Sequence, residues 1–456
     1  MTTSTQTVQE ARTKRSARRS WWVDGIEASV WIASAAAVAL MIESGGLLTV
    51  SAIDYLYALG RAAGIVAAVL VMSQVLLISR SPWIERAIGH DRAALKHTRF
   101  GKIAFILMLV HVAFITLMSA YYDGKGALEQ LLSFSDAGWF MLAAQVGFGI
   151  FALVVATSLY LVRSRWRYEN WYAVHLSVYI AIAFVVPHQF MEGSTFRSGG
   201  LAWWFWFTLY AFAFGSLIVF RMIRPGVNLM RHDLRVSEVT VNPDGSTSVV
   251  MTGRNLDRLR ARPGQFFLWR FLDKERGREA HPFSLSRQPD GKTLRITVKP
   301  SGDHSGSLAG LAIGTRVVAD GPLGVFSDVS RTKPGLALFA AGIGITPIRA
   351  MLETHGADDG ACTVVYRVRS AEEAPLLDEV QALAASSGAQ LHVLTGGRGD
   401  GWAPAGHEGS LTDLIPDLTD RDVYICGPAV WAAVVEAEAL AAGVPRESVH
   451  REQFAW

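Results

Sequence analysis

Apolar positions gather in long, nearly charge-free runs before about residue 225 and in short alternating segments after it. A helix that spans the hydrocarbon core of a bilayer needs about 20 apolar residues, because it rises about 1.5 Å per residue. Five runs near that length and one shorter run, bracketed by Glu27 and Glu43, occur in the first half. They predict helices that span a lipid bilayer near residues 22–43, 52–79, 98–120, 137–162, 171–190 and 201–222.

Arginine and lysine residues gather at alternate connections between these helices. The basic positions are Arg80, Arg86, Arg92, Lys96, Arg99, Lys102, Arg163, Arg165, Arg167, Arg221 and Arg224. The opposite connections hold little beyond Lys125 and Arg197. Because cytoplasmic loops carry the excess of Lys and Arg, we expect a multi-pass protein of the plasma membrane with both termini in the cytoplasm. Residues 1–21 are expected to form a basic, disordered cytoplasmic tail.

The second half of the chain has the pattern of a soluble protein. Short alternating runs predict an antiparallel β-barrel with strands at 236–241, 247–252, 265–271, 294–299 and 315–320. Strands at 336–341, 362–368, 390–395 and 422–426 then alternate with helices at 347–355 and 372–387, which predicts a parallel α/β sheet. The expected fold is multidomain: a tail (1–21), a six-helix transmembrane domain (22–224), a barrel (230–330) and an α/β nucleotide-binding domain (334–456).

Charge and cysteine content narrow the chemistry. A net charge of +3 gives no case for nucleic-acid binding. Cys362 and Cys426 are too few for a disulfide framework, a zinc site or a cysteine-ligated iron–sulfur cluster. Any metal must therefore be held by other side chains.

Four histidines lie within the predicted membrane helices. His97 and His111 are on the third helix and His175 and His188 on the fifth, and both helices run outward. The histidines therefore pair by depth, His97 with His175 near the inner face and His111 with His188 nearer the outer face. The fourteen-residue spacing of His97 and His111 corresponds to about 21 Å, enough to separate two haems with paired imidazole ligands. One such histidine alone is equally consistent with hydrogen bonding between helices, but two matched pairs favour haem.

The thirteen-residue spacing of His175 and His188 requires an irregular fifth helix. At about 100° per residue, a step of fourteen nearly restores one helix face, whereas a step of thirteen misses it by about 140°. Pro187, immediately before His188, is the expected source of the irregularity, although an ordinary kink near a helix end explains this proline equally well.

Arg61 lies at the outer end of the second predicted helix. Its guanidinium is a candidate partner for a haem propionate, or for an anionic product or oxygen species near the outer haem. Simple extension of the side chain to the membrane interface is the alternative.

Two segments of the second half have the composition of nucleotide-binding loops. A Gly/Ser-rich turn at Gly302–Ser307, which contains Ser305, Gly306 and Ser307, offers backbone N–H groups to phosphate, although such a turn alone is more often a surface loop. The segment Gly342–Pro347, with Gly344, Ile345 and Thr346, follows an apolar strand and opens a helix. It is a looser pattern than the usual dinucleotide fingerprint.

Together with His281–Pro282–Phe283–Ser284–Leu285–Ser286 and Cys426–Gly427–Pro428, these loops resemble the ferredoxin–NADP reductase superfamily. Joined to a six-helix domain with paired histidines, the chain resembles a prokaryotic member of the NADPH oxidase and ferric reductase superfamily. The resemblance covers about residues 25–456.

The resemblance implies roles for these residues. His281, Pro282, Phe283 and Ser284, followed by Leu285 and Ser286, would bind the flavin and its ribityl chain. The FAD phosphates would lie along Thr297, Lys299 and Ser305–Ser307. The nicotinamide nucleotide would contact Gly342, Gly344, Ile345, Thr346 and Pro347, with Cys426, Gly427 and Pro428 near the nicotinamide. Phe454 would cover the flavin face, with Trp456 as the alternative.

Arg367 and Arg369 follow the second strand of the predicted nucleotide-binding sheet. A guanidinium suits the 2′-phosphate of NADPH, so these residues favour NADPH while leaving NADH open. Either arginine is also consistent with a solvated strand end.

The leading functional prediction is a transmembrane oxidoreductase. It would pass electrons from cytoplasmic NADPH through FAD and two b-type haems to O2 on the outer side, producing superoxide. The alternatives are a ferric-chelate reductase, a haem subunit that passes electrons to a partner protein, and a non-catalytic redox sensor. Animal-type oxidases carry a further histidine where this chain has Ile115, which leaves the acceptor open between O2 and ferric iron. No obligate protein partner is evident.

Overall fold

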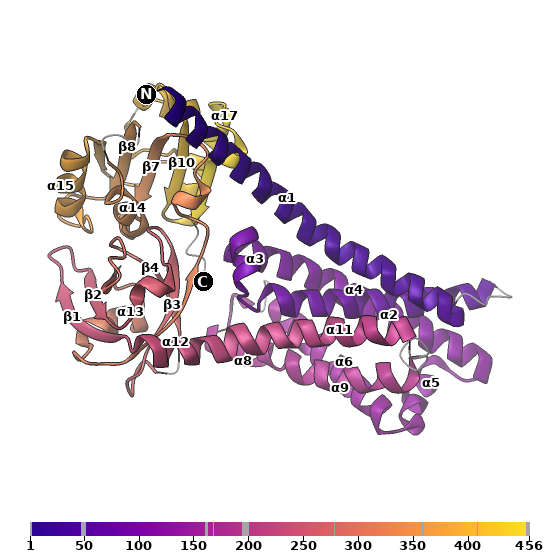
Figure 1. The fold of residues 1–456 in the computed structure, drawn as a ribbon. Coiled ribbons are helices and arrows are strands. Elements are labelled where there is room, and N and C mark those ends of the chain that lie inside the picture. The colour runs from indigo at the N-terminus through magenta and orange to yellow at the C-terminus, as the bar shows by residue number, and fades with distance from the viewer. Residues whose placement is uncertain are drawn as a thin grey trace. The chain divides into compact units, whose positions relative to one another are not determined.

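The computed structural model describes residues 2–46, 52–159, 163–166, 168–193, 200–277, 279–356, 360–407 and 409–452. Figure 1 labels its helices and strands. The chain forms two compact units. The membrane unit comprises Asp24–Ser81 and Arg92–Val219, and the reductase unit comprises Met1–Val23, Pro82–Asp91 and Phe220–Trp456.

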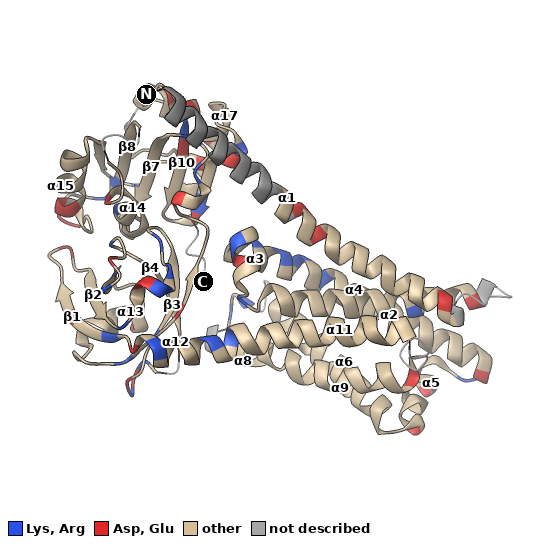
Figure 2. Cartoon of the chain, viewed as in Figure 1, with Lys and Arg blue, Asp and Glu red and all other residues tan. Residues whose placement is uncertain are grey.

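The six predicted membrane spans are confirmed by length and composition. The spans are Asp24–Ser44, Asp54–Leu77, Arg92–Asp123, Trp139–Ser158, Asn170–Glu192 and Gly200–His232. The corresponding helices are α1 (Thr2–Met41), α2 (Ala52–Leu77), α4 (His90–Asp123), α6 (Trp139–Ser158), α8 (Tyr168–Leu176) with α9 (Val178–Glu192), and α11 (Gly200–Leu217) with α12 (Arg224–His232). Figure 2 shows few charged residues along α2, α6, α9 and α11, as a multi-pass membrane protein requires.

The predicted basic tail is part of a helix and is not disordered. Helix α1 begins at Thr2 and continues into the first membrane span. Residues 2–24 contain neither Gly nor Pro, so nothing in the local sequence ends the helix before the span begins.

The fifth span is irregular, as predicted, but its interruption lies at Ser177 rather than at Pro187. Helix α8 ends at Leu176, and the Ser177 N–H donates to the Val174 carbonyl at 3.0 Å, a tighter turn than the α-helix. Pro187 lies inside α9. The interruption therefore lies between the two histidines of this span, two residues after His175.

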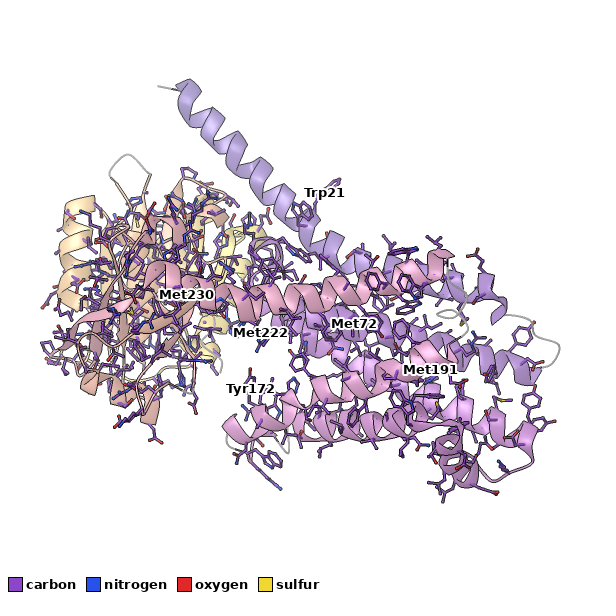
Figure 3. All side chains as sticks on the ribbon, turned by 60° about the horizontal axis from the view of Figure 1, so that its bottom comes forward. Trp21, Met72, Tyr172, Met191, Met222 and Met230 are labelled. Atoms are coloured by element: carbon purple, nitrogen blue, oxygen red, sulfur yellow. The ribbon has the colours of Figure 1, made fainter. Side chains whose placement is uncertain are left out.

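Close helix contacts hold the membrane unit together. A Cβ added to Gly147 on α6 would lie 2.9 Å from the Ala181 carbonyl oxygen and 2.8 Å from a Val185 methyl group on α9. Small residues permit such approaches between membrane helices. Met72, labelled in Figure 3, is only 1% exposed and packs with Phe151 in the core of this unit.

Two antiparallel sheets and one parallel sheet build the reductase unit. The first sheet has the order β1 (Arg235–Val241), β2 (Thr247–Thr252) and β5 (Thr293–Val298), and the second has the order β4 (His281–Ser284), β3 (Phe266–Phe271) and β6 (Val317–Leu323). Isolated bridges join Arg235 to Arg316 and Leu285 to Ile296, and one apolar core lies between the sheets. Closure of these strands into a barrel stays a prediction.

The predicted parallel sheet is confirmed. Its order is β11 (Val449–Glu452), β10 (Arg421–Cys426), β7 (Gly335–Ala341), β8 (Cys362–Val368) and β9 (Gln390–Thr395). Separate apolar cores cover its two faces, which are packed by α14 (Ile345–Leu352), α15 (Leu377–Ser387) and α17 (Ala429–Ala441). Ligands of such sheets bind at the carboxyl ends of the strands, where the predicted nucleotide loop lies.

Candidate functional site

The outer histidine pair lies beside a cavity in the membrane unit. The ring centres of His111 on α4 and His188 on α9 are 6.5 Å apart, with the rings tilted by 42°. Both side chains line a cavity of about 450 Å³, within the range of cofactor pockets. Two metal–imidazole bonds of about 2.0–2.1 Å each account for most of this separation, so one metal ion fits between the two rings.

Backbone carbonyls orient both outer imidazoles. The Nδ1–H of His111 donates to the Gly60 carbonyl at 2.9 Å, and the Nδ1–H of His188 donates to the Val185 carbonyl. A carbonyl only accepts, so Nδ1 carries the proton in each ring and Nε2 keeps its lone pair. Each ring therefore offers Nε2 as a ligand while its other nitrogen is held in place.

Gly64 makes the approach of His111 possible. A Cβ at this position of α2 would lie 2.5 Å from His111 Nδ1 and 2.9 Å from Cε1, so a side chain there would force the imidazole to move. The missing side chain leaves the space through which the imidazole reaches the Gly60 carbonyl, one helical turn before Gly64.

The inner pair has similar spacing. The ring centres of His97 and His175 are 6.1 Å apart, and the rings are inclined by 66°. Trp171, one turn before His175 on α8, stacks on the imidazole with ring centres 5.0 Å apart. The guanidinium carbon of Arg163 lies 4.6 Å from the centre of the Trp171 ring, a cation–π contact that fixes the indole.

The outer cavity also has polar lining. Arg61 and Glu192 line it, as do Gln189 and Tyr210, whose hydroxyl donates to the Gln189 side chain. Ile115 contributes an apolar wall. The predicted position of Arg61 near the outer histidine pair thus agrees with the cavity lining.

The predicted flavin-binding motif begins with β4. His281, Pro282 and Phe283 are partly exposed and Ser284 is buried. The hydroxyl of Ser284 has no hydrogen-bond partner among the residues that the structure describes. A buried hydroxyl without a partner is costly, so it fits a polar group of a bound cofactor.

The next residues of the motif point into the protein. Leu285 and Ser286 are fully buried, and Thr297 is 3% exposed. The Thr297 hydroxyl donates to the Ser286 hydroxyl at 2.9 Å, and Arg295 Nε donates to the same oxygen at 3.1 Å. These hydrogen bonds hold Ser286, which follows β4, in place. Lys299 is exposed, and Ser305–Ser307 form the end of α13 (Asp303–Ser307).

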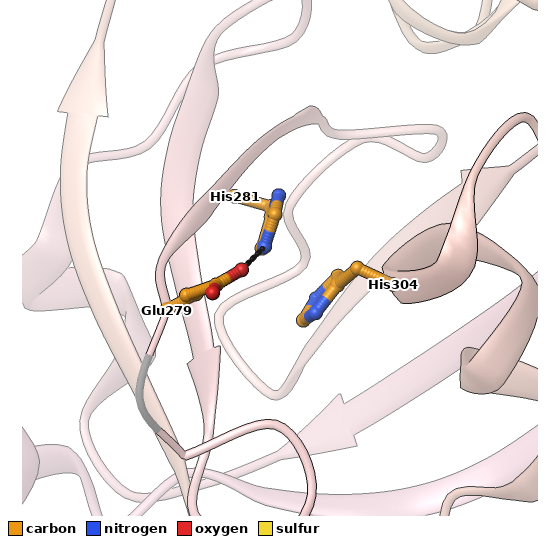
Figure 4. Close-up of side chains that lie close together, drawn as sticks. All are labelled: Glu279, His281 and His304. Carbon is orange, nitrogen blue, oxygen red and sulfur yellow. Dashed lines mark hydrogen bonds and ion pairs between the residues drawn. The ribbon is translucent and has the colours of Figure 1, made fainter. Parts of the chain in front are cut away.

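Glu279, His281 and His304 lie together beside this strand (Figure 4). The two imidazoles stack with ring centres 3.6 Å apart, and His281 Nε2 lies 3.2 Å from the Glu279 carboxylate. Sequence reasoning assigned no role to His304, although the residue lies within the Gly/Ser-rich turn.

The nucleotide loop lies at the carboxyl end of β7. Gly342 has φ +55°, a conformation that favours glycine, and a Cβ there would meet no atom within 4 Å. A Cβ at Gly344 would lie 2.2 Å from the Cys426 carbonyl oxygen, so this glycine lets β7 and β10 end side by side. Ile345, Thr346 and Pro347 are buried in the first turn of α14, where proline is tolerated.

The motif at the end of β10 packs against the same loop. Cys426 is fully buried, so its backbone rather than its sulfur lies nearest the loop. A Cβ at Gly427 would lie 2.9 Å from the Ala341 side chain. Pro428 precedes the first turn of α17. Phe454 and Trp456 lie outside the described residues.

Arg367 has a second arginine as its neighbour. Its guanidinium donates to the Gly397 carbonyl at 3.3 Å, and burial together with the nearby charge of Arg398 lowers its pKa. Arg369 is exposed at the end of β8. Sequence reasoning missed Arg398, which follows β9 in the next connection, because only the sheet order brings β8 and β9 together.

Comparisons with known proteins agree with this division of the chain. The family model "Ferric reductase like transmembrane component" matches residues 63–186, and "Oxidoreductase NAD-binding domain" matches residues 338–436.

Proteins similar to part of this chain include oxidoreductases. A flavohemoprotein of Vibrio cholerae is 32% identical over 39% of this chain, and the alignment spans 47% of that protein's length. Ferredoxin–NADP reductase B of Sorangium cellulosum is 30% identical over 39% of this chain and 79% of its own length. The crystal structure of the flavohem-like FAD/NAD-binding domain of a Vibrio cholerae nitric oxide dioxygenase is 29% identical, with a TM-score of 0.42, and covers 49% of this chain and 98% of that one.

The chain thus joins a ferric reductase-like membrane domain to an FAD/NAD-binding reductase module, an arrangement suited to electron transfer across a membrane. This oxidoreductase therefore has the domain architecture of the NADPH oxidase and ferric reductase superfamily.

Proposed function

We propose that the protein carries electrons from cytoplasmic NADPH through FAD and two b-type haems to O2 on the outer side, where superoxide forms. The observation that carries this proposal is the presence of two imidazole pairs, with ring centres 6.1 and 6.5 Å apart, at two depths of one helix bundle. Matched spacing at both depths is expected of two six-coordinate haems and is unnecessary for hydrogen bonding between helices.

The residues of the chain would hold the cofactors as follows. His97 and His175 would bind the inner haem iron, and His111 and His188 the outer one. The β4 segment with Ser284 would hold the flavin, and Gly342–Thr346 the nicotinamide nucleotide. FAD supplies the conversion from the two-electron hydride of NADPH to the single electrons that haem iron accepts.

The direction of transfer follows from the charges of the connections. The basic residues between α2 and α4 and after α11 support a cytoplasmic position for these connections, and in the proposal both termini and the reductase unit are inside. The same proposal includes the division of the chain into domains at residues 22–224, 230–330 and 334–456, and the closure of the middle domain as a barrel. It also includes the covering of the flavin by Phe454 or Trp456.

Reduction of ferric iron is the second candidate function. The description of the matching membrane family favours it. O2 is the preferred acceptor in this proposal because Arg61, which lines the outer cavity together with Glu192 and the apolar Ile115, suits a small acceptor that becomes an anion. A partner protein as acceptor has no supporting observation among the described residues.

Loss of one outer ligand should remove one haem. His111→Ala and His188→Ala are each expected to lose one of two low-spin haems while the other haem and the flavin remain, because the inner pair has its own ligands. Haem content per flavin, measured by pyridine haemochrome assay and optical spectra, checks this, with exposed His407→Ala as the control. Retention of both haems in either outer variant contradicts the pairing.

Gly64→Ala should alter the outer haem without removing it. The added methyl group must displace the His111 ring and weaken its bond to the Gly60 carbonyl, which lowers the basicity of the ligand. A less basic ligand stabilises oxidised iron less, so the midpoint potential of one haem should rise. Gly149→Ala is the matched control, since a Cβ there meets nothing within 4 Å. Identical redox titrations of the two variants would remove this role for Gly64.

The variants Arg367→Ala and Arg398→Ala should each bind NADPH more weakly without a comparable loss of NADH binding. A hydrogen bond to a charged group contributes about 1.5–3 kcal/mol, so KM for NADPH should rise about tenfold or more in each variant. KM for NADH should change little, because NADH lacks the 2′-phosphate. Exposed Arg258→Ala provides the control, and equal losses for both nucleotides would exclude a phosphate contact.

A further inference from the structure

An indole and a guanidinium pack beside the inner histidine pair. The Trp171 indole lies against the His175 imidazole, with ring centres 5.0 Å apart and ring planes inclined by 29°. The guanidinium carbon of Arg163 lies 4.6 Å from the centre of the Trp171 ring. His175 also faces His97 across 6.1 Å, which already accounts for a metal ion between the two imidazoles. The contacts of Trp171 and Arg163 are therefore additional to the pairing of the histidines.

Local structure positions both side chains. Trp171 and His175 are four residues apart on α8, so they are neighbours on one face of this helix. Arg163 lies in the connection between α6 and α8, where its backbone N–H donates to the Leu159 carbonyl at 2.8 Å. Trp171 Nε1 donates to the hydroxyl of Ser158, the last residue of α6, at 3.3 Å. The end of α6 thus fixes the indole from one side while α8 carries it.

Ordinary interfacial packing explains this arrangement less well. Tryptophan and arginine are common at membrane interfaces, where lipid headgroups and water suffice as their partners. Trp171 and Arg163 are instead both partly buried, and the indole lies nearly parallel to an imidazole. An interfacial anchor does not require that contact.

The two histidine pairs have different surroundings. At the outer pair, backbone carbonyls accept hydrogen bonds from His111 and His188, and such acceptors make an imidazole a more basic ligand that favours oxidised iron. At the inner pair, an aromatic ring contacts His175, and a positive charge contacts that ring. A nearby positive charge favours the state of the metal that carries one positive charge fewer, which is the reduced state.

The charge of Arg163 is close enough to affect a redox equilibrium. The two contacts place the guanidinium about 10 Å from the His175 ring centre, which is about one Debye length at 0.1 M salt. Water screens this charge incompletely, because Arg163 and Trp171 are partly buried. At an effective dielectric constant of about 20, a unit charge at about 10 Å changes a one-electron equilibrium constant by a factor on the order of ten.

We propose that Trp171 and Arg163 are positioning residues for the inner haem: the indole fixes the plane of the His175 imidazole, and the guanidinium held on the indole raises the midpoint potential. The inference rests on the proposed function, in which His97 and His175 bind this haem. Reduced flavin supplies one electron, and ferric iron becomes ferrous iron, so the positive charge beside His175 falls by one. The charge of Arg163 makes this transfer more favourable.

The test is a potentiometric redox titration of the full-length, detergent-purified chain, followed by optical spectra. Arg163→Gln should lower the midpoint potential of one haem by about 59 mV, the equivalent of a tenfold change, and leave the other haem almost unchanged. Arg163→Lys keeps the charge and should retain most of the potential. Arg165→Gln is the matched control, because it removes the same charge from an exposed position in the same connection and should have a smaller effect. The haem that responds should be the one that His111→Ala retains.

A double-mutant cycle separates the stacked arrangement from a charge that acts alone. Trp171→Leu removes the ring on which the guanidinium lies, so it should lower the potential of the same haem by a similar amount. Arg163→Gln added to Trp171→Leu should then have little further effect, because the two side chains act as one unit. Trp171→Phe keeps an aromatic face and should show a smaller shift, which preserves the test if Trp171→Leu fails to fold.

Electron paramagnetic resonance of the oxidised protein provides a second measurement. The low-spin haem signal depends on the angle between the planes of the two axial imidazoles, which are inclined by 66° at the inner pair. Trp171→Leu should change the signal of one haem, whereas Arg165→Gln should leave both signals as they are. An unchanged signal in Trp171→Leu overturns the positioning role of the indole.

The outcomes separate this inference from the proposed function. With both haems bound, unchanged potentials in Arg163→Gln overturn the inference alone. Equal shifts in Arg163→Gln and Arg165→Gln do the same, as do additive effects of the Arg163 and Trp171 substitutions. Absence of both haems from the unmodified, folded chain overturns the proposed function together with the inference.

Discussion

In the membrane unit, neighbouring helices bring a pair of imidazoles together at each of two depths. The need to form both pairs explains the irregular features of the bundle. The spacings of 6.1 and 6.5 Å require α4 to face α8 near one end and α9 near the other. A regular helix cannot present His175 and His188 on one face, so the fifth span is interrupted at Ser177. Gly64 has no side chain where the His111 ring must pass, and Gly147 lets α6 approach α9 closely.

A different constraint applies to the reductase unit. The ends of its strands must lie close together where a nucleotide is expected to bind. Gly344 and Gly427 allow the loops after β7 and β10 to pack against each other without side chains between them. The same edge of the sheet carries Arg367 near the end of β8 and Arg398 in the connection after β9, so positive charge gathers where a phosphate is expected. On the flavin side, the unpartnered hydroxyl of Ser284 and nitrogen of His304 are the polar atoms that a cofactor would satisfy.

Structural elements that leave a long periodic pattern in the sequence could be predicted. Features that arise from contacts between residues distant in sequence could not. Hydropathy identified all six spans, and alternation with turn residues identified the longer strands. The short strands β4 and β11 were missed because four residues carry too little periodicity. The position of the helix interruption was assigned to Pro187, the local helix breaker, whereas the structure has it at Ser177. Gly64, Trp171, Arg398 and His304 acquire their significance only from neighbours that are distant in sequence or one helical turn away. The sequence signal for Gly64 was absent altogether, because glycine is common in membrane helices.

The most direct test of the central claim is an optical spectrum of the detergent-purified protein with FAD. NADPH is added without oxygen, and air is then admitted. The account predicts that NADPH reduces two low-spin haems, and that their bands disappear promptly in air while superoxide is detected. A folded preparation without haem would contradict the central claim, and so would haem that NADPH leaves oxidised in the presence of FAD. Haem that is reduced by NADPH but is reoxidised only by a ferric chelate would contradict O2 as the acceptor.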